Sequence, residues 1–379
     1  MTRSHRDLSA KQSIAAAYIE YLSSAPLSAY SSTHLKCEDP IVKTKLITAI
    51  LITSSLLCSW PNSAETDPVE HNGPHNWGRW GADDQRGAAN LITPESIVAA
   101  AKLIRSGRTF SLAIPIDNAG PVYPGRLSPH HIMVATGADY SAGATGLGFG
   151  NMKFADDYIY MPLQGSTQWD ALSHAWYGDH LYNGVNQSEI RSSPGAGGAT
   201  RLGVENVKTS FVGRGVLIDI LAFKGGSLPP GYAITRADIE GAMAKQGTEV
   251  RKGDVVILRT GFVPGYYEVE GAIERMAYVA GPHTGIGDDV VGWIVQQDIA
   301  GIAADNVALE VLPNPIPERT LAIHGHLLRD LGVYIGEIWW LEELAADCTK
   351  DGRWEFFLAA QPLNIPGAVG SPLNPIAIK

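Results

Sequence analysis

Short apolar, β-rich runs alternate with helical segments through the second half of the chain, and this alternation limits its fold most. Gly215–Ile220 (GVLIDI) and Asp254–Arg259 (DVVILR) are typical of strands, and Thr235–Ala244 between them is typical of a helix. Asp288–Gln296 has the acidic first turn of a helix and precedes the strand-like run Ile299–Ala304. These patterns predict an α/β fold.

The composition is that of a folded domain with a small-molecule ligand. The 379 residues are 45% hydrophobic and 18% charged, which suffices for a substantial core. The net charge of -10 and the absence of a Lys/Arg run argue against a nucleic-acid partner. Because residues 65–379 contain no repeat and no Pro/Ser linker, we expect one catalytic domain there. The 41 glycines and 23 prolines predict ordered loops, most clearly at Pro121–His131 and Pro362–Pro375.

The N-terminal region contains a short apolar run, Leu46–Leu57, with lysines before it and small residues after it. At about a dozen residues the run is too short to span a bilayer, and it fits a secretory signal peptide cleaved near Ala64. Because a signal peptide rarely has 41 residues ahead of it, we place the true start near Val42. The protein is thus expected to be exported, periplasmic or secreted, with no membrane span. A buried apolar helix or strand is the alternative.

Cleavage after Ala64 would leave Cys348 as the one remaining cysteine of three. A single cysteine forms no internal disulfide and no zinc–thiolate cluster. Cys58 would suggest a lipoprotein, but Leu57 precedes it where a small residue is expected. Export would therefore add no covalent cross-link.

The segment Gln164–His174, QGSTQWDALSH, brings polar side chains together at metal-ligand spacing. It follows Tyr158–Leu163, which is typical of a strand, and strand ends are common positions for sites in α/β proteins. Asp170 is a hard oxygen ligand, and His174 can be a ligand or a general base. Taken alone, one Asp and one His four residues apart fit a hydrogen-bonded structural pair equally well.

QGSTQWDALSH resembles the His-x-Gly-Thr-His-x-Asp-x-Pro-x-His signature of the cyclase superfamily, which includes bacterial kynurenine formamidase and isatin hydrolase. The second part of the family pattern is a histidine three residues before a Leu-Leu pair and a glutamate at the end of the next strand, which His324 and Glu337 match. The resemblance covers nearly all of residues 65–379 and implies the swivelling β/β/α fold of that superfamily. Its other segments are Asn76–Gly81, Gly213–Leu217, Leu258–Gly261 and Gly367–Pro372.

The resemblance assigns roles position by position. Family formamidases hold two divalent metals: the first two signature histidines serve one metal, the signature Asp bridges both, the later His and Glu complete the set, and the last signature histidine accepts a proton. Here Gln164 and Gln168 occupy the places of the first two histidines, and Asp170 that of the bridging Asp. His324 and Glu337 match the later His and Glu, and His174 matches the last signature histidine. Ser166 and Leu172 replace the family's glycine and proline. This chain therefore lacks both of the histidines that, in the family, bind the first metal alone.

The two glutamines predict a site for one ion. A neutral amide oxygen is a much weaker zinc ligand than imidazole, although it can serve a harder cation. Asp170, His324 and Glu337 can still hold one ion with open positions for water and substrate. We expect one divalent metal, Mn²⁺ or Zn²⁺, with Gln168 or Gln164 contacting the metal through its oxygen or the substrate through its amide.

The resemblance implies a metal-dependent hydrolase that opens a cyclic or aryl amide, or an ester or lactone. The ion would activate water, and His174 would accept the proton and return it to the leaving group. Trp169, Trp176 and Tyr177 either line a pocket for an aromatic substrate or belong to the core. A metal-free lyase or isomerase that uses His174 with Asp170, and a non-catalytic small-molecule binder, are the alternatives. The family also implies a homo-oligomer, a dimer or tetramer.

Several polar residues outside the motif fit either a functional or a structural role. His326 is an alternative to His324, but it stands one residue before the Leu pair instead of three. His130 and His131 lie in a Pro-rich loop and either cover the site or are solvated. Asp305, Asn306 and Glu310 follow a strand and either contact the ligands or the substrate or cap the next turn. Asp83 and Asp84 fit a solvated turn, and Arg259 with Thr260 fits an anion site or a local ion pair.

Overall fold

The computed structural model describes residues 73–144, 150–192 and 197–379. They belong to one compact unit, Asp67–Lys379. The expected signal peptide, its cleavage near Ala64 and the expected start near Val42 lie outside the described residues. Within the described ranges, no helix has the length and apolar character needed to cross a bilayer.

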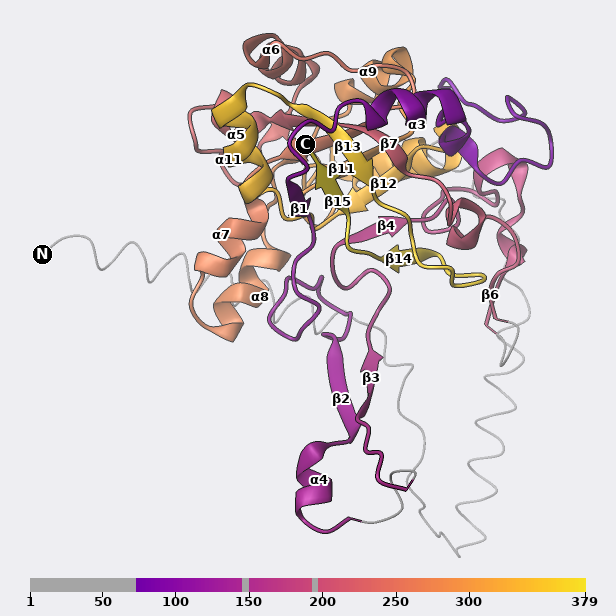
Figure 1. Cartoon of the computed structure of the whole chain (residues 1–379). Helices are drawn as coiled ribbons and strands as arrows, with labels where there is room; N and C mark the ends of the chain where they lie inside the picture. The colour runs from indigo at the N-terminus through magenta and orange to yellow at the C-terminus, as the bar shows by residue number, and fades with distance from the viewer. Residues whose placement is uncertain (1–72, 145–149, 193–196) are drawn as a thin grey trace, which may run out of the picture. The chain divides into compact units, whose positions relative to one another are not determined.

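A nine-stranded mixed sheet is the centre of this unit (Figure 1). Its four middle strands are parallel, and antiparallel strands extend the sheet on both sides. In order across the sheet, the strands are β1 (Thr109–Ser111), β15 (Ile376–Ile378), β13 (Glu355–Ala359), β7 (Val212–Asp219), β9 (Val255–Arg259), β11 (Gly301–Ala304), β12 (Tyr334–Glu337), β4 (Gln168–Asp170) and β14 (Gly370–Pro372).

Helical connections join the parallel strands, as parallel pairing requires. The chain passes through α5 (Ile220–Phe223) and α6 (Arg236–Gln246) between β7 and β9, and through α7 (Phe262–Glu268), α8 (Ala272–Ala280) and α9 (Asp289–Gln297) between β9 and β11. The middle strands are almost wholly buried, in keeping with their continuous aliphatic runs. The remaining helices are α3 (Pro94–Ala101), α4 (Gly137–Ser141), α10 (Ala322–His324) and α11 (Glu342–Asp351).

Shorter elements complete the described part of the chain. Three two-stranded sheets pair β2 (His130–Ala135) with β3 (Asp156–Tyr160), β5 (Ile190–Arg191) with β6 (Gly198–Ala199), and β8 (Ala233–Ile234) with β10 (Gly285–Ile286). Short helical turns lie at η1 (Gly87–Leu91), η2 (Tyr182–Gly184), η3 (Gln187–Glu189), η4 (Val204–Val207), η5 (Pro317–Arg319) and the π-helical turn η6 (Gly325–Leu331).

The alternation of strands and helices predicted for residues 215–304 is confirmed, with β7, α6, β9, α9 and β11 in the expected order. The prediction that a strand at Tyr158–Leu163 delivers the motif is wrong. That strand, β3, ends at Tyr160 and pairs with β2, whereas Gln168–Asp170 forms a strand of the main sheet itself. Two expected loops also contain strand residues. The loop predicted at Pro121–His131 ends in the first two residues of β2, and the loop predicted at Pro362–Pro375 contains β14.

The segment after residue 75 anchors the turn that carries a candidate ligand. The Asn76 amide N–H donates to the Asp330 carbonyl at 2.8 Å, and the Asn76 side chain donates to the Leu331 carbonyl at 2.8 Å. Trp77 Nε1 donates to the Arg329 carbonyl at 2.6 Å. These three bonds hold η6, which follows His324 directly in the chain. The Asn-Trp pair of this segment therefore has a structural role.

Candidate metal centre

Strand pairing brings three site residues onto one face of the sheet. In the antiparallel register of β4 and β12, Gln168 lies opposite Glu337, and Asp170 lies opposite Ile335. Because side chains alternate between faces along a strand, Gln168, Asp170 and Glu337 share one face. Trp169 points to the other.

His324 completes this group from the end of α10. Its Nε2 lies 3.3 Å from Glu337 Oε1 and 4.0 Å from Asp170 Oδ2. All three residues are buried, and each offers one ligand atom within 4.8 Å of the others. Ligands bonded to one ion at about 2.1 Å are at most about 4.2 Å apart, so the spacing is close to that of a coordination shell.

Glu310 orients the His324 ring. His324 Nδ1 contacts Glu310 Oε1 at 2.6 Å, and the His324 backbone N–H donates to the same oxygen at 3.0 Å. A ring whose Nδ1–H donates to a carboxylate presents Nε2 as the ligand atom, the usual arrangement behind a metal-binding histidine. Burial opposes protonation of His324, but its hydrogen bonds to Glu310 and Glu337 raise its pKa well above the ordinary value.

Two buried oxygens in the group have no hydrogen-bond partner among the described residues: Asp170 Oδ2 and Gln168 Oε1. Gln168 Nε2 donates to Glu337 Oε2 at 2.7 Å and, more weakly, to Asp170 Oδ1 at 3.5 Å. Because carboxylates only accept, the Gln168 amide nitrogen must face them, and this leaves its oxygen free. Burial raises the pKa of Asp170 to about 6, and the nearby Glu337 adds to the rise. Two carboxylates, one imidazole and orphaned oxygens fit one divalent cation.

His174 and Gln164 lie beside this group. His174 Nε2 is 3.8 Å from Asp170 Oδ1, and its Nδ1 is 3.5 Å from Gln164 Nε2. The His174 side chain is 21% exposed, whereas those of Asp170, His324 and Glu337 are at most 7% exposed, so it is the most open to solvent of these four. Burial lowers the pKa of His174, which favours the neutral imidazole that a general base requires. The structure therefore brings all six residues of the predicted ligand and base set together.

Gly370 makes room for one of the two glutamines. It lies opposite Asp170 in the β14–β4 register. A Cβ added at Gly370 would lie 2.4 Å from Gln164 Nε2, closer than any real contact. The glycine thus allows the Gln164 side chain to enter the site.

Arg126 is a functional candidate that the sequence did not indicate. Its Nη1 donates to the Gln164 carbonyl at 3.0 Å, and its charge lowers the pKa of both Asp170 and His174. Among the described residues, no carboxylate forms an ion pair with it. Its place in the expected Pro-rich loop gives no hint of this role, since its proximity to the site arises only in the fold.

The three aromatic residues of the predicted pocket differ in position. Trp169 is fully buried, stacks on Phe211 at 4.7 Å and donates from Nε1 to the Ala360 carbonyl at 2.7 Å. This is the placement of a core residue and not of a pocket wall, because β4 directs Trp169 away from Asp170. Trp176 and Tyr177 are partly buried beyond the strand, and their role as pocket walls stays a prediction.

The alternative histidines lie elsewhere. His326 Nδ1 is 3.2 Å from Asp330 Oδ2, so His324 and not His326 contacts the ligand group. His131 Nε2 contacts Asp157 Oδ2 at 2.5 Å across the β2–β3 pair, where both side chains are exposed. His130 Nδ1 contacts the Ser128 carbonyl at 2.6 Å.

Several other candidates have structural partners. Asp305 accepts from the Thr260 N–H, the Thr260 hydroxyl and the Gly261 N–H at 2.6–2.8 Å, and therefore caps the turn after β9. Asn306 donates to the Thr284 carbonyl at 2.8 Å. The further pairs are Arg259 with Asp219 and Glu342, Asp84 with the Gly87 N–H, and Asp83 with Arg201.

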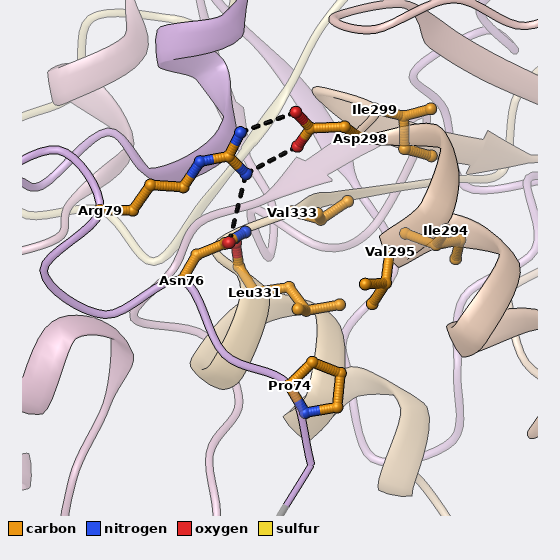
Figure 2. Close-up of a pocket in the computed structure, with 9 residues that line it drawn as sticks. All are labelled: Pro74, Asn76, Arg79, Ile294, Val295, Asp298, Ile299, Leu331 and Val333. Carbon is orange, nitrogen blue, oxygen red and sulfur yellow. Dashed lines mark hydrogen bonds and ion pairs between the residues drawn. The ribbon is translucent and has the colours of Figure 1, made fainter.

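A shallow pocket lies at the opposite end of β12 from Glu337 (Figure 2). Leu331 and Val333 lie just before that strand and line the pocket. The other lining residues are Ile294 and Val295 of α9, Asp298 and Ile299 after that helix, and Pro74, Asn76 and Arg79. Figure 2 shows the Arg79 guanidinium held by Asp298 at 2.7 Å and by Asn76 Oδ1 at 3.2 Å. Because its polar groups already pair with one another, this pocket offers no chemistry comparable to that around Asp170.

Comparison with known proteins identifies the family. The Cyclase family model, described as "Putative cyclase", matches residues 110–311. A crystal structure described as a novel cyclase is 66% identical, with a TM-score of 0.77, over 81% of this chain and 100% of that chain. This chain belongs to the cyclase family.

More distant solved structures share the fold. Isatin hydrolase A from Labrenzia aggregata, bound to benzyl benzoate, is 18% identical with a TM-score of 0.52, over 75% of this chain and 97% of that one. Isatin hydrolase A from Ralstonia solanacearum is 17% identical with a TM-score of 0.50, over 76% and 98%. No curated protein matches the chain. The expected α/β fold of the cyclase superfamily, with its swivelling β/β/α domain, is confirmed.

Proposed function

We propose that this protein is a metal-dependent hydrolase in which Asp170, His324 and Glu337 hold one divalent ion. The observation that carries the proposal is the buried, unpartnered Asp170 Oδ2 facing His324 Nε2, whose ring Glu310 fixes from behind. A buried carboxylate oxygen without a donor is costly, and a cation is the partner that relieves the cost.

Each residue has a defined task in hydrolysis. The ion, when bound, supplies Lewis-acid polarisation of a substrate carbonyl and activation of water. His174, neutral because of its burial, accepts the proton of the attacking water and returns it to the leaving nitrogen or oxygen. Arg126 lies where its guanidinium can stabilise negative charge developing on the substrate. Gln168 Oε1 is free to contact the ion or a substrate N–H.

The substrate class we propose is a cyclic or aryl amide, with an ester or lactone as the chemical variant. Two proteins that share this fold are isatin hydrolases, and isatin is a cyclic aryl amide. Trp176 and Tyr177 follow His174 two and three residues later in the chain and would flank an aromatic substrate. For the ion we propose Mn²⁺ or Zn²⁺, since one imidazole with two carboxylates suits either.

One observation favours a metal-free alternative. Gln168 Nε2 donates to Glu337, and His324 also pairs with Glu337, so this carboxylate is satisfied by the protein's own groups. An enzyme of this kind would carry out a lyase or isomerase step with His174 and Asp170 as acid and base.

Elemental analysis of protein purified without a metal-affinity tag separates the two proposals. Stoichiometric Mn or Zn that is absent from Glu337→Ala supports the hydrolase. A metal-free protein that keeps full activity in EDTA contradicts it. His174→Ala serves as the matched variant, because it should abolish turnover of lactams, formanilides or lactones while metal content stays nearly unchanged. Loss of metal in that variant would instead make His174 a ligand.

A further inference from the structure

Two non-glycine residues next to the metal centre have a left-handed backbone. Leu309, which precedes Glu310, has a φ of 53°. Ile338, which follows Glu337, has a φ of 60°. Both are buried, with 1% and 2% of their surface exposed. A positive φ is unfavourable for a bulky residue and exceptional for a β-branched one, so it persists only where the surrounding structure holds it. Such positions are concentrated at functional sites.

Asn306 contacts both of these residues. Its carbonyl accepts from the Ile338 N–H at 2.8 Å, and its Nδ2 donates to the Leu309 carbonyl at 3.2 Å. Nδ2 also donates to the Thr284 carbonyl at 2.8 Å, so both N–H groups of the amide are used. Asn306 follows β11 and is fully buried. It therefore links the two left-handed residues from inside the core.

The left-handed residues set the direction of the carboxylates beside them. Glu310 Oε1 is 2.6 Å from His324 Nδ1, and His324 Nε2 is 3.3 Å from Glu337 Oε1. Together with the two bonds from position 306, these contacts close a ring that joins both segments through one imidazole. Because φ fixes the course of the chain at the next residue, a return of Leu309 to a negative φ would turn the Glu310 side chain away from His324.

Other groups also hold the two left-handed residues. The Ile286 N–H donates to the Leu309 carbonyl at 3.0 Å, and the Thr167 hydroxyl donates to the Ile338 carbonyl at 2.5 Å. Asn306 differs from both of them, because it contacts the two segments at once. Loss of its side chain should therefore loosen one segment relative to the other and leave the fold of each in place.

We propose that Asn306 is a positioning residue, which holds Glu310 and Glu337 at the separation that His324 bridges and so forms the centre before an ion enters. The inference rests on the proposed metal centre and adds a residue that contacts neither the ion nor the substrate. A site that is already formed binds its ligand more tightly, because less order has to be created on binding. The affinity for the ion should therefore depend on the amide of Asn306.

Asn306→Leu tests the proposal, because leucine has nearly the same shape and donates no hydrogen bond. Competition of metal-stripped protein with a chelator for Mn²⁺ and Zn²⁺ should give a dissociation constant about 10-fold higher than the parent's. This is the lower end of the range for outer partners of a ligand, because the backbone carbonyl of position 306 still accepts its bond. Asn314→Leu is the matched control, since Asn314 is 3% exposed and accepts from the Ile316 N–H at 2.8 Å. It should keep the parent's affinity.

Amide hydrogen exchange on the whole 379-residue chain measures the positioning without an ion. The His324 N–H donates to Glu310 Oε1 at 3.0 Å, so its exchange reports whether Glu310 is in place. In the metal-stripped parent this amide should exchange within about 3-fold of its rate in the metal-loaded protein. In metal-stripped Asn306→Leu it should exchange at least about 10-fold faster than in the parent.

Unchanged metal affinity in Asn306→Leu would overturn the proposal, as would an equal loss in Asn314→Leu. If Asn306→Leu does not fold, the parent decides: a His324 amide that exchanges more than about 10-fold faster without metal than with it shows that the ion and not the protein forms the centre. If the parent takes up no metal, the proposed hydrolase fails instead. Equal exchange of the His324 amide in the parent and Asn306→Leu would then refute the positioning role on its own.

Discussion

The substitution Glu310→Gln tests whether His324 is a metal ligand. Glu310 is not itself among the proposed ligands, and glutamine keeps the shape of its side chain while removing the charge. Glu310 is fully buried, and its Oε1 receives two donors from His324, at 2.6 Å and 3.0 Å. A glutamine oxygen can still accept both, which preserves the ring orientation. The hydrogen bonds lose their charge assistance, however, and become about half as strong.

The expected effect is a loss of metal affinity of about 10- to 100-fold, the range for removal of a ligand's outer partner. This corresponds to about 1.4–2.7 kcal/mol of binding free energy. The structure supports such a magnitude, since a hydrogen bond to a charged group contributes about 1.5–3 kcal/mol and a neutral one about 0.5–1.5 kcal/mol. Competition of metal-stripped protein with a chelator for Mn²⁺ and Zn²⁺ measures the affinity directly.

Asp305→Asn is the matched control. Asp305 is also a fully buried carboxylate that accepts from backbone amides, but its donors belong to Thr260 and Gly261. It should lose stability, seen in thermal unfolding, and keep the parent's metal affinity. The reasoning is refuted if Glu310→Gln binds metal as the parent does, or if both variants lose affinity equally.

Three other changes address the remaining parts of the molecule. Gln164→His with Gln168→His restores the imidazoles of the family signature, and elemental analysis should show the metal content rise from one to two ions per chain; an unchanged content would mean that other groups limit the second ion. Arg126→Met should lower kcat/KM about 100-fold with unchanged metal content, because it removes a charge-stabilising donor, and full activity would exclude this role. Burial lowers the pKa of His283 to about 4, below the value of about 6.5 in the unfolded chain, so the unfolded state binds more protons between these values and stability is lost as the pH falls through that range. The free energy of unfolding, measured in urea, should therefore fall by about 3 kcal/mol more in the parent than in His283→Gln between about pH 7 and about pH 4. Parallel plots of this free energy against pH for the two proteins would contradict the prediction.

The sequence predicted the middle of the sheet well because its strands are buried on both faces. Continuous aliphatic runs such as Val255–Arg259 have little choice of environment, and the helix at Arg236–Gln246 begins with a Thr235 capping box. The strand Gln168–Asp170 has no such pattern. It is three residues long, contains two polar side chains and is defined by its neighbours β12 and β14. The family resemblance marked these residues as part of a site, but it did not predict a strand there.

The same short strand explains why Trp169 was difficult to assign from the sequence. Adjacency to Asp170 along the chain suggests proximity to the site, but in a strand it means the opposite face. Gly336 lies across from Trp169 in the register, and a Cβ there would lie 2.9 Å from the Trp169 ring. Arg126 shows the converse, since it is distant in sequence and meets Gln164 only in the fold.

The charges around the site favour one divalent ion over two. Asp170, Glu337 and Glu310 are buried carboxylates, and Arg126 is the cationic group beside them once His324 is neutral and binds an ion through Nε2. Since an uncompensated buried charge costs several kcal/mol, one dication can balance the excess negative charge. A second dication in the place of the family's first metal would have Asp170 as its one anionic ligand, with two neutral amides beside it. With glutamines at these two positions, the ligand set is therefore too weak to favour a second ion, whereas the glutamine oxygens remain available to the ion held by Asp170, His324 and Glu337.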